Sequence, residues 1–299
     1  MSKHRESTIP EIEGATRIVE RARKRLVFTD GERPSVTCFA KTKEASLNVL
    51  NEAAWDRVGR SVLASIDVVV PEVLDEGRDG ELAWVKYEQL GGRALGDGER
   101  LVADPAFGGV IDRAVEIMQV LDGVQTTSPI PLSDPEDPEI YRQERTHRMQ
   151  EGARQMVEQG VLTQTEVDEA AEAFSKQMRH YDRRLQHHDI LPWHLFDLGD
   201  GRLGLIDAEF GGMRVRFYDA AYTLCKLHAT IKNDEWTRRF WACCREVFGS
   251  EGFDEKVLLP MSFTAIREMG ERHQRGDQEG FDRLKQLVHS VLHERPITF

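Results

Sequence analysis

The sequence predicts an α+β fold of two lobes: a small lobe with an antiparallel β-sheet and one helix, then a larger, mainly helical lobe. Two observations support the small lobe: residues 16–43 and 65–90 are rich in β-branched and aromatic residues, and the stretch between them has helical spacing. A third supports the large lobe, since apolar residues after Gly91-Gly92 recur mostly at helical spacing. We therefore expect a first lobe at residues 1–90 and a second lobe at residues 91–299.

The small lobe begins as an antiparallel meander. Asp30-Gly31 is a typical hairpin turn between two strands. The expected strands are Thr16–Glu20, Arg25–Thr29, Ser35–Lys43, Ser65–Leu74 and Glu81–Leu90, with a turn at residues 76–80 between the last two. The expected helix is Glu44–Leu63, with an apolar stripe of Leu47, Leu50, Ala54, Trp55 and Val58.

The large lobe begins with three expected helices, Phe107–Asp122, Pro138–Gln159 and Gln164–Leu185. Thr163 and Glu166 have the spacing of a capping box at the start of the third helix. A β-hairpin turning at Asp200-Gly201 follows. Residues from Asp219 onward have helical spacing again.

Composition narrows the class of protein. The chain has 299 residues, of which 40% are hydrophobic and 31% charged, as in soluble globular proteins. It contains no run of roughly 20 apolar residues that could span a bilayer, so we expect a cytoplasmic protein that does not bind a membrane. The formal charge of −12 argues against a nucleic-acid partner, because a phosphate backbone attracts a basic face. The oligomeric state is left open.

The chemistry is concentrated in Gln186–Asp219. Asp189 precedes the predicted hairpin, and Asp207 directly follows its second strand, Leu203–Ile206. A hairpin brings its two ends together, so the two carboxylates are expected to lie close to each other. Such a pair suits phosphoryl transfer, in which one carboxylate orients or deprotonates a hydroxyl while the other holds Mg²⁺ against the phosphates.

This segment resembles the Brenner-type motif of the aminoglycoside phosphotransferase and choline kinase family, H-G-D-x-x-P-x-N followed by a strand ending in I-D-W-E. His187, Asp189, Pro192 and Asp207 match the motif, and Asp219 matches a later family aspartate. The resemblance implies a protein-kinase-like fold and an ATP-dependent phosphotransferase acting on the hydroxyl of a small-molecule acceptor. It also implies that residues 1–90 are the nucleotide-binding lobe and residues 91–299 the catalytic and acceptor-binding lobe. Asp189 would be the catalytic residue and Asp207 the Mg²⁺ ligand. ATP could be replaced by another nucleoside triphosphate.

His194 departs from the family motif. The family has Asn at this position, five residues beyond the catalytic aspartate, where it contributes to the second metal site. Imidazole binds Mg²⁺ less well than an amide oxygen and binds Mn²⁺ or other transition metals better. His194 therefore leaves open a single-metal enzyme, an enzyme that uses another metal, or a degenerate member of the family.

The first lobe carries weaker matches to the family. Lys41 resembles the lysine that holds the α- and β-phosphates, with Lys43 as its rival, and Glu52 resembles its ion-pair partner. Backbone groups around Glu88 and Leu90 resemble the hinge that binds adenine. The loop at residues 22–24 lacks the glycines of a phosphate-binding turn, so Arg23 or Lys24 would have to supply charge instead.

Two rival functions stay open. The first is a nucleotide-binding or regulatory pseudoenzyme of the same fold, suggested by His194 and the glycine-free loop. The second is a metallohydrolase built on His187, His188, Asp189 and Asp207. The acceptor is not predicted, although acidic residues of the large lobe (Glu139, Glu144 and Glu268) could bind an amine.

Overall fold

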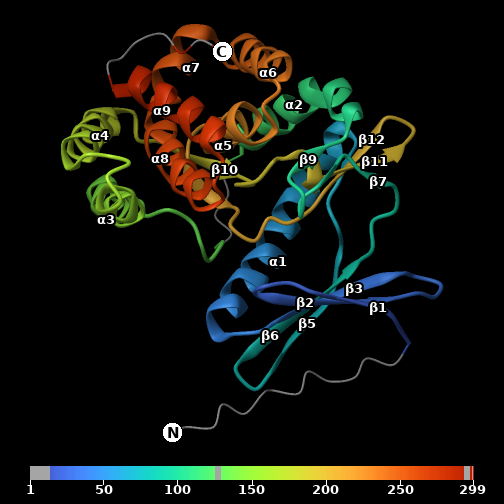
Figure 1. The fold of residues 1–299 in the computed structure, drawn as a ribbon. Coiled ribbons are helices and arrows are strands. Elements are labelled where there is room, and N and C mark those ends of the chain that lie inside the picture. Colours follow the sequence, from blue (N-terminus) through green and yellow to red (C-terminus); the bar gives the residue numbers. More distant parts are fainter. Residues whose placement is uncertain (1–13, 125–128, 293–296, 298) are drawn as a thin grey trace, which may run out of the picture.

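The computed structural model describes residues 14–124, 129–292, 297 and 299, so the first part of the predicted small lobe, residues 1–13, lies outside the described residues. Figure 1 shows a small sheet-based body below a larger, mainly helical body, with helix α1 running from one toward the other. The predicted α+β architecture is confirmed. None of the helices in these residues is both long enough and apolar enough to cross a bilayer.

A five-stranded antiparallel sheet forms the small body, in the order β1-β2-β3-β6-β5. The predicted turn at residues 76–80 is wrong, because β5 continues through Asp79. Gly77 belongs to that strand: a Cβ there would lie 2.6 Å from the indole of Trp84, so the glycine makes room for the ring. The strands are β1 (Ala15–Glu20), β2 (Lys24–Thr29), β3 (Ser35–Ala40), β5 (Val73–Asp79) and β6 (Leu82–Glu88).

Helix α1 (Lys43–Leu63) begins at Thr42, whose hydroxyl accepts the Ala45 N–H at 3.1 Å. The expected apolar stripe is wrong at Leu47, which is 45% exposed. Small residues face the sheet instead, including Val49, while Trp55 is buried in the core of the large body. The helix is therefore buried on two sides, which a single amphipathic stripe does not capture.

A second sheet combines strands from both sides of the predicted lobe boundary, in the order β4-β12-β11-β7. The strands are β4 (Val68–Val69), β7 (Arg93–Ala94), β11 (Leu195–Gly199) and β12 (Arg202–Leu205). Asp200 and Gly201 link β11 to β12 with φ angles of 55° and 76°, the backbone conformation of a tight hairpin turn. The predicted hairpin is confirmed, and the lobe division at residue 90 stays a prediction.

The helical body packs around one large core. The capping box of Thr163 and Glu166 is confirmed. The helix expected up to Leu185 ends at Gln177, because Arg183–Gln186 instead forms β10 and pairs with β13 (Gly212–Val215).

The other elements of this body are short strands β8 (Gly96–Asp97) and β9 (Val102–Ala103) and helices α2 (Ile111–Asp122), α3 (Pro138–Glu158), α4 (Gln164–Gln177), α5 (Tyr218–Cys225), α6 (Asp234–Phe248), α7 (Ser250–Lys256), α8 (Leu258–Gln274) and α9 (Gln278–Leu292). A π-helical turn, Lys226–Ile231, extends α5. Short 3₁₀ turns occupy Ala64–Ile66, Pro105–Val110, Met178–His180 and Pro192–His194.

Candidate active site

Asp219 holds the loop that carries Asp189. Its carboxylate is fully buried and accepts the backbone N–H groups of His187 at 2.8 Å and His188 at 2.5 Å. Burial raises the pKa of Asp219 to about 7, against the lowering effect of these two hydrogen bonds. His188 adopts a left-handed backbone with a φ of 82°, which is costly for a residue with a side chain. The buried carboxylate thus stabilises a sharply bent loop.

The rings of His187 and His188 have separate environments. His187 is buried with its ring edge-on to Trp55 at 4.9 Å, and burial lowers its pKa to about 3. His188 stacks on Tyr218 at 4.3 Å. Among the described residues no three His, Cys, Asp or Glu side chains form a ready metal site. The ligand set of the metallohydrolase hypothesis is therefore not assembled in this part of the chain.

The Asp189 carboxylate has an unused hydrogen-bond acceptor. Its Oδ1 atom is buried and has no hydrogen-bond partner in the described part of the chain. Its Oδ2 atom lies 3.5 Å from Nδ1 of His194. Burial raises the pKa of Asp189 to about 6, although the charge of His194 opposes this rise. An unsatisfied buried oxygen is rare in native structures, and a catalytic role or a bound water or ion can account for it.

His194 connects the two aspartates. Its Nδ1 lies 3.0 Å from the backbone oxygen of Asp189, and its Nε2 lies 3.1 Å from Oδ2 of Asp207. Burial disfavours the charged ring, but the carboxylates of Asp189 and Asp207 outweigh it and raise the pKa of His194 to about 9. The carboxyl groups of Asp189 and Asp207 therefore face one shared environment.

Asp207 lies at the centre of a charged cluster at the end of β12. Lys24 Nζ is 2.6 Å from Oδ1 of Asp207, 3.3 Å from Glu209 and 3.4 Å from Glu52. Burial opposes the charge on Asp207, yet Lys24 and His194 hold its pKa well below the usual range. Burial also raises the pKa of Glu52 to about 7, with Lys24 acting against it. The cluster joins β2 and α1 of the small body to the loop of the large body.

Lys41 lies outside this cluster, so the expected ion pair with Glu52 is not formed. Lys24 pairs across the sheet with Ala40, which places their side chains on one face, and the next residue in sequence projects the other way. Lys41 Nζ instead lies 2.6 Å from Glu20 and also binds the backbone oxygen of Arg21. The rival Lys43 pairs with Glu81 at 3.0 Å. The lysine beside Glu52 is one that the sequence placed in a turn.

Some backbone N–H groups of the expected hinge already donate hydrogen bonds within the small body. The N–H of Glu88 binds the Glu72 oxygen at 2.9 Å, and the N–H of Gln89 binds the Pro34 oxygen at 2.9 Å. Leu90 lies against Gly204 of β12, where an added Cβ would come within 2.8 Å of its Cδ1 atom. The hinge therefore packs directly on the hairpin that ends at Asp207.

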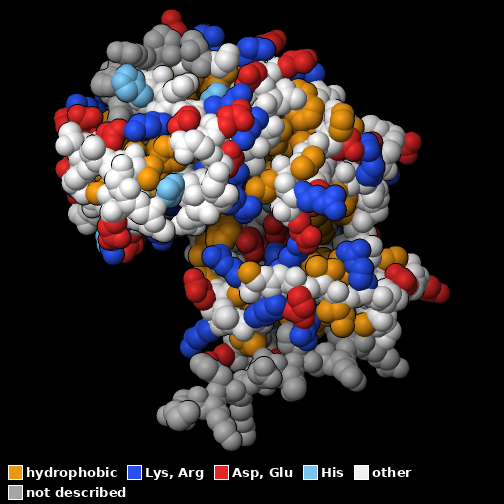
Figure 2. Space-filling model, viewed as in Figure 1, with side chains coloured by type: hydrophobic (Ala, Val, Ile, Leu, Met, Phe, Trp, Pro, Cys, Tyr) orange, Lys and Arg blue, Asp and Glu red, His pale blue; other side chains and the backbone are white. Residues whose placement is uncertain are grey.

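The turn between β1 and β2 faces the large body. The guanidinium of Arg23 lies 5.8 Å from the ring centre of Phe210, and Arg21 pairs with Glu99. Figure 2 shows acidic and basic side chains together where the surface is hollowed between the two bodies. Arg23 and Lys24 thus bring positive charge to the side of the small body that faces Asp207.

Asn51 on α1 is a positioning residue that sequence reasoning missed. Its Nδ2 donates to the backbone oxygens of Glu209 at 3.1 Å and Gly211 at 2.9 Å, and its Oδ1 accepts the Leu132 N–H at 2.8 Å. It is completely buried, so these bonds tie α1 to the segment after Asp207. An Asn inside a helix that also carries Glu52 was the available signal.

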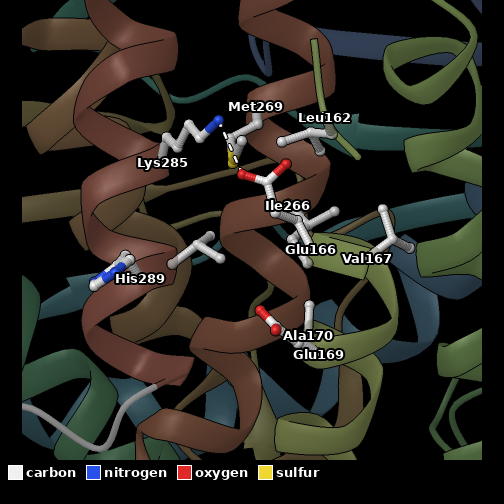
Figure 3. Close-up of a pocket in the computed structure, with 10 residues that line it drawn as sticks. Leu162, Glu166, Val167, Glu169, Ala170, Ile266, Met269, Lys285 and His289 are labelled. Carbon is white, nitrogen blue, oxygen red and sulfur yellow. Dashed lines mark ion pairs between the residues drawn. The ribbon is translucent and has the colours of Figure 1, made fainter. Parts of the chain in front are cut away.

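A separate hollow lies between α4, α8 and α9 (Figure 3). It is lined mainly by apolar side chains such as Ile266 and Met269, and Lys285 forms an ion pair across it with Glu166 at 3.0 Å. None of the predicted site residues lines it. Asp189 and Asp207 lie elsewhere, linked by His194, and Asp207 contacts Lys24 of the small body.

Comparisons with known proteins agree with this geometry. Residues 16–259 match the model of the phosphotransferase enzyme family. A search of curated proteins gives no significant match. Solved structures that resemble the chain include the GDP and kanamycin complex of APH(2″)-IIIa, with a TM-score of 0.62, 20% identity, and 97% of this chain and 96% of that chain covered.

A second similar structure is the ternary complex of a thermostable mutant of APH(4)-Ia with ADP and hygromycin B. It has a TM-score of 0.61 and 13% identity, and the match covers 95% of this chain and 96% of that chain. At these identities the likeness concerns the fold. It confirms the predicted two-lobed, kinase-like architecture.

Proposed function

The chain belongs to the phosphotransferase enzyme family, as its motif predicted, and from this premise we propose that it transfers the γ-phosphoryl group of ATP, or another nucleoside triphosphate, to a hydroxyl of a small molecule. The observation that carries the proposal is the buried Oδ1 of Asp189, which has no hydrogen-bond partner among the described residues. The carboxyl group of Asp189 is linked through His194 to Asp207. One carboxylate is free to accept a proton while the other lies among charged groups. This division suits phosphoryl transfer.

Asp189 orients the acceptor and takes its proton. The acceptor hydroxyl oxygen attacks the γ-phosphorus, and the bond from that phosphorus to the β–γ bridging oxygen breaks. The hydroxyl proton passes to the Asp189 carboxylate, and the nucleoside diphosphate leaves. Because burial raises the pKa of Asp189 to about 6, the carboxylate is a better base than an exposed aspartate and is still ionised at neutral pH.

Lys24 binds the phosphates in place of the expected Lys41. Its ammonium group lies in the cleft beside Asp207 and Glu52, and Glu52 orients it. Arg23 supplies a second positive charge from the glycine-free turn. Side-chain charge replaces the backbone N–H groups that a glycine-rich turn would offer.

The donor set around Lys24 suits a hard divalent cation. Asp207 and Glu209 place carboxylate oxygens 2.6 and 3.3 Å from Lys24 Nζ, so these two side chains already stabilise a cation at this point. Mg²⁺ is bound by one or two carboxylates plus substrate phosphates, so a complete protein cage is not required. Asp207 would hold the ion with His194 beside it, and the bound ion would neutralise phosphate charge. The imidazole of His194 makes Mn²⁺ a second candidate.

The nucleobase is assigned to the hinge. Glu88 and Leu90 lie where the five-stranded sheet ends and the chain crosses to the large body. Their backbone groups would bond the base while Leu90 covers one of its faces. The choice between ATP and GTP is left to measurement.

The test is nucleotide turnover with Mg²⁺ or Mn²⁺, using a panel of aminoglycosides, choline, amino acids, sugars and nucleosides as acceptors. Wild type should consume ATP in a metal-dependent way, and Asp207→Ala should abolish turnover. Asp197→Ala is the matched control, because Asp197 is an exposed aspartate on the same hairpin. Turnover of Asp207→Ala at the wild-type rate would refute the assigned role.

A nucleotide-binding pseudoenzyme is the second candidate. It is favoured by Lys24, which pairs directly with Asp207, and by His194 at the position of the family Asn. Thermal-shift titration separates the two functions, because a ligand that binds the native state raises its stability. Stabilisation by nucleotide without turnover of any acceptor supports the pseudoenzyme, and no stabilisation by any nucleotide rejects the kinase.

A further inference from the structure

Two rows of side chains face each other near Asp189. Residues four apart on a helix lie on one face. The first row, on α5 and its π-helical extension, is Tyr218, Tyr222 and Lys226, and the second row, on α8, is Phe263, Arg267 and Glu271.

The rows are in direct contact along their length. The ring of Tyr218 lies 5.8 Å from that of Phe263, and the guanidinium of Arg267 lies 4.8 Å from the ring of Tyr222. At the far end Lys226 Nζ is 2.8 Å from Glu271. The two rows together form one strip of side chains, which is aromatic at the Tyr218 end and charged at the Lys226 end, with Arg267 at its centre.

Arg267 has spare hydrogen-bond donors that reach solvent. It donates to the Tyr218 hydroxyl at 2.8 Å and to Glu268 at 3.2 Å, and its side chain is 46% exposed. A guanidinium has five N–H donors, so several are left for a ligand. The ring of Tyr218 stacks on that of His188 at 4.3 Å, and His188 directly precedes Asp189, so Arg267 lies beside the loop that carries Asp189.

Two of the three carboxylates that the sequence suggested for binding an amine, Glu139 and Glu268, are already in ion pairs. Glu268 is 3% exposed and lies 2.5 Å from Lys226 and 3.2 Å from Arg267. Glu139 is exposed on α3 and pairs with Arg142. An ammonium group approaching Asp189 along the strip would meet the positive charge of Arg267 rather than an unpaired acid.

We propose that the acceptor of this chain is a hydroxylated oxyanion, a carboxylate or a phosphate ester, with its negative group bound by Arg267 and its hydroxyl presented to Asp189. This inference rests on the proposed phosphotransferase function and narrows its substrate class. The planar fork of Arg matches both oxyanions through two parallel hydrogen bonds. The rings of Tyr218 and Tyr222 would cover the carbon chain between the two groups.

The test uses probes matched in carbon skeleton. Gluconate and glucose 6-phosphate are compared with glucamine, and 3-hydroxypropionate with 3-aminopropanol, first by thermal shift without nucleotide and then by ATP consumption. The variants are Arg267→Gln, the charge-retaining Arg267→Lys, and Arg239→Gln as the matched control. Arg239 is an arginine of similar exposure, 44%, that pairs with Asp112 on a distant part of the body.

We expect at least one oxyanion to stabilise wild type and Arg239→Gln, while the amines do not. Arg267→Gln should lower the binding affinity for that oxyanion by about tenfold or more, and Arg267→Lys should retain part of the affinity. A preference for the carboxylates or for glucose 6-phosphate would identify the source of the oxyanion. Stronger binding of the amines, or responses that are equal in wild type and Arg267→Gln, including no response, would overturn the inference.

Two readouts keep this inference separate from the proposed function. Stabilisation of wild type by Mg²⁺ and ATP without any acceptor tests the nucleotide site alone. Its failure rejects the phosphotransferase proposal even if oxyanions bind. If nucleotide binds but the binding of every oxyanion is independent of Arg267, only the proposed acceptor class is rejected. The unfolding temperature of Arg267→Gln without ligand shows whether that variant is folded.

Discussion

The Asp189 loop and the Lys24 strand form opposite sides of one cleft and follow their family pattern to different degrees. On the large body, the sequence spacing of His187, Asp189 and Asp207 corresponds to one continuous loop and hairpin. On the small body, the positive charge beside Glu52 comes from β2 rather than from the end of β3. The lysine beside Glu52 is therefore on a different strand from the one that the family pattern predicts.

The reason is the different origin of the two arrangements. Asp189 and Asp207 are joined by a short chain segment, so local turn chemistry is enough to bring them together. Lys24 reaches Asp207 across 183 residues of sequence, through the register of β2 on β3 and the packing of two bodies. A one-residue difference in strand phase moves a side chain to the opposite face.

The largest expected effect is the loss of activity on changing Asp189, on the large-body side of the cleft. Asp189→Asn keeps the shape of the side chain and removes its ability to take a proton, so kcat should fall by about 10²–10⁴-fold. Steady-state turnover of the best acceptor from the panel measures it. A loss of less than about threefold would mean that Asp189 is not the base, whatever its position.

The next effect decides between the two lysines. Lys24→Met should lower kcat/KM for ATP by about 10²–10³-fold, because a positive charge next to the phosphates is lost. Lys41→Met should change it by less than about threefold, since Lys41 pairs with Glu20 on the outer side of the sheet. The reverse order of effects would restore Lys41 as the phosphate-binding residue and show that the cleft rearranges when nucleotide binds.

The pH dependence sharpens the role of Asp189. A base must be ionised, and burial places the pKa of Asp189 at about 6. Activity should therefore fall as pH drops through about 6, by about tenfold for each further unit, and level off above pH 7. The control is the pH dependence of the residual activity of Asp189→Asn. ATP ionises in the same way in both assays, so any pH effect that comes from ATP remains in this variant. An acid limb that persists in this variant would assign the titration to another group.

The smallest expected effect tests the phase of α1. Leu47→Ser should change the free energy of unfolding by less than about 0.5 kcal/mol, because Leu47 is 45% exposed. Val49→Ala should cost about 1.5 kcal/mol, since it removes two buried methyl groups at about 0.8 kcal/mol each. Urea denaturation measures both, and equal costs would support the stripe expected from the sequence alone.

Local features of this protein could be predicted from its residues without a structure. The antiparallel strands, the capping box of Thr163, the Asp200-Gly201 turn and the order of elements all depend on neighbours within a few positions. The motif from His187 to Asp207 predicted the family for the same reason, because its chemistry lies within one short segment.

Long-range packing determined the rest. The end of the helix at Gln177, the burial of α1 on two sides, the anchoring of the Asp207 loop by Asn51, and the pairing of Lys24 with Glu52 all depend on elements distant in sequence. Residue patterns carry the periodicity of a strand or helix but not the register between strands or the docking of one body on another. Those contacts arise only when the whole chain has folded, and they place Lys24 rather than Lys41 beside Glu52.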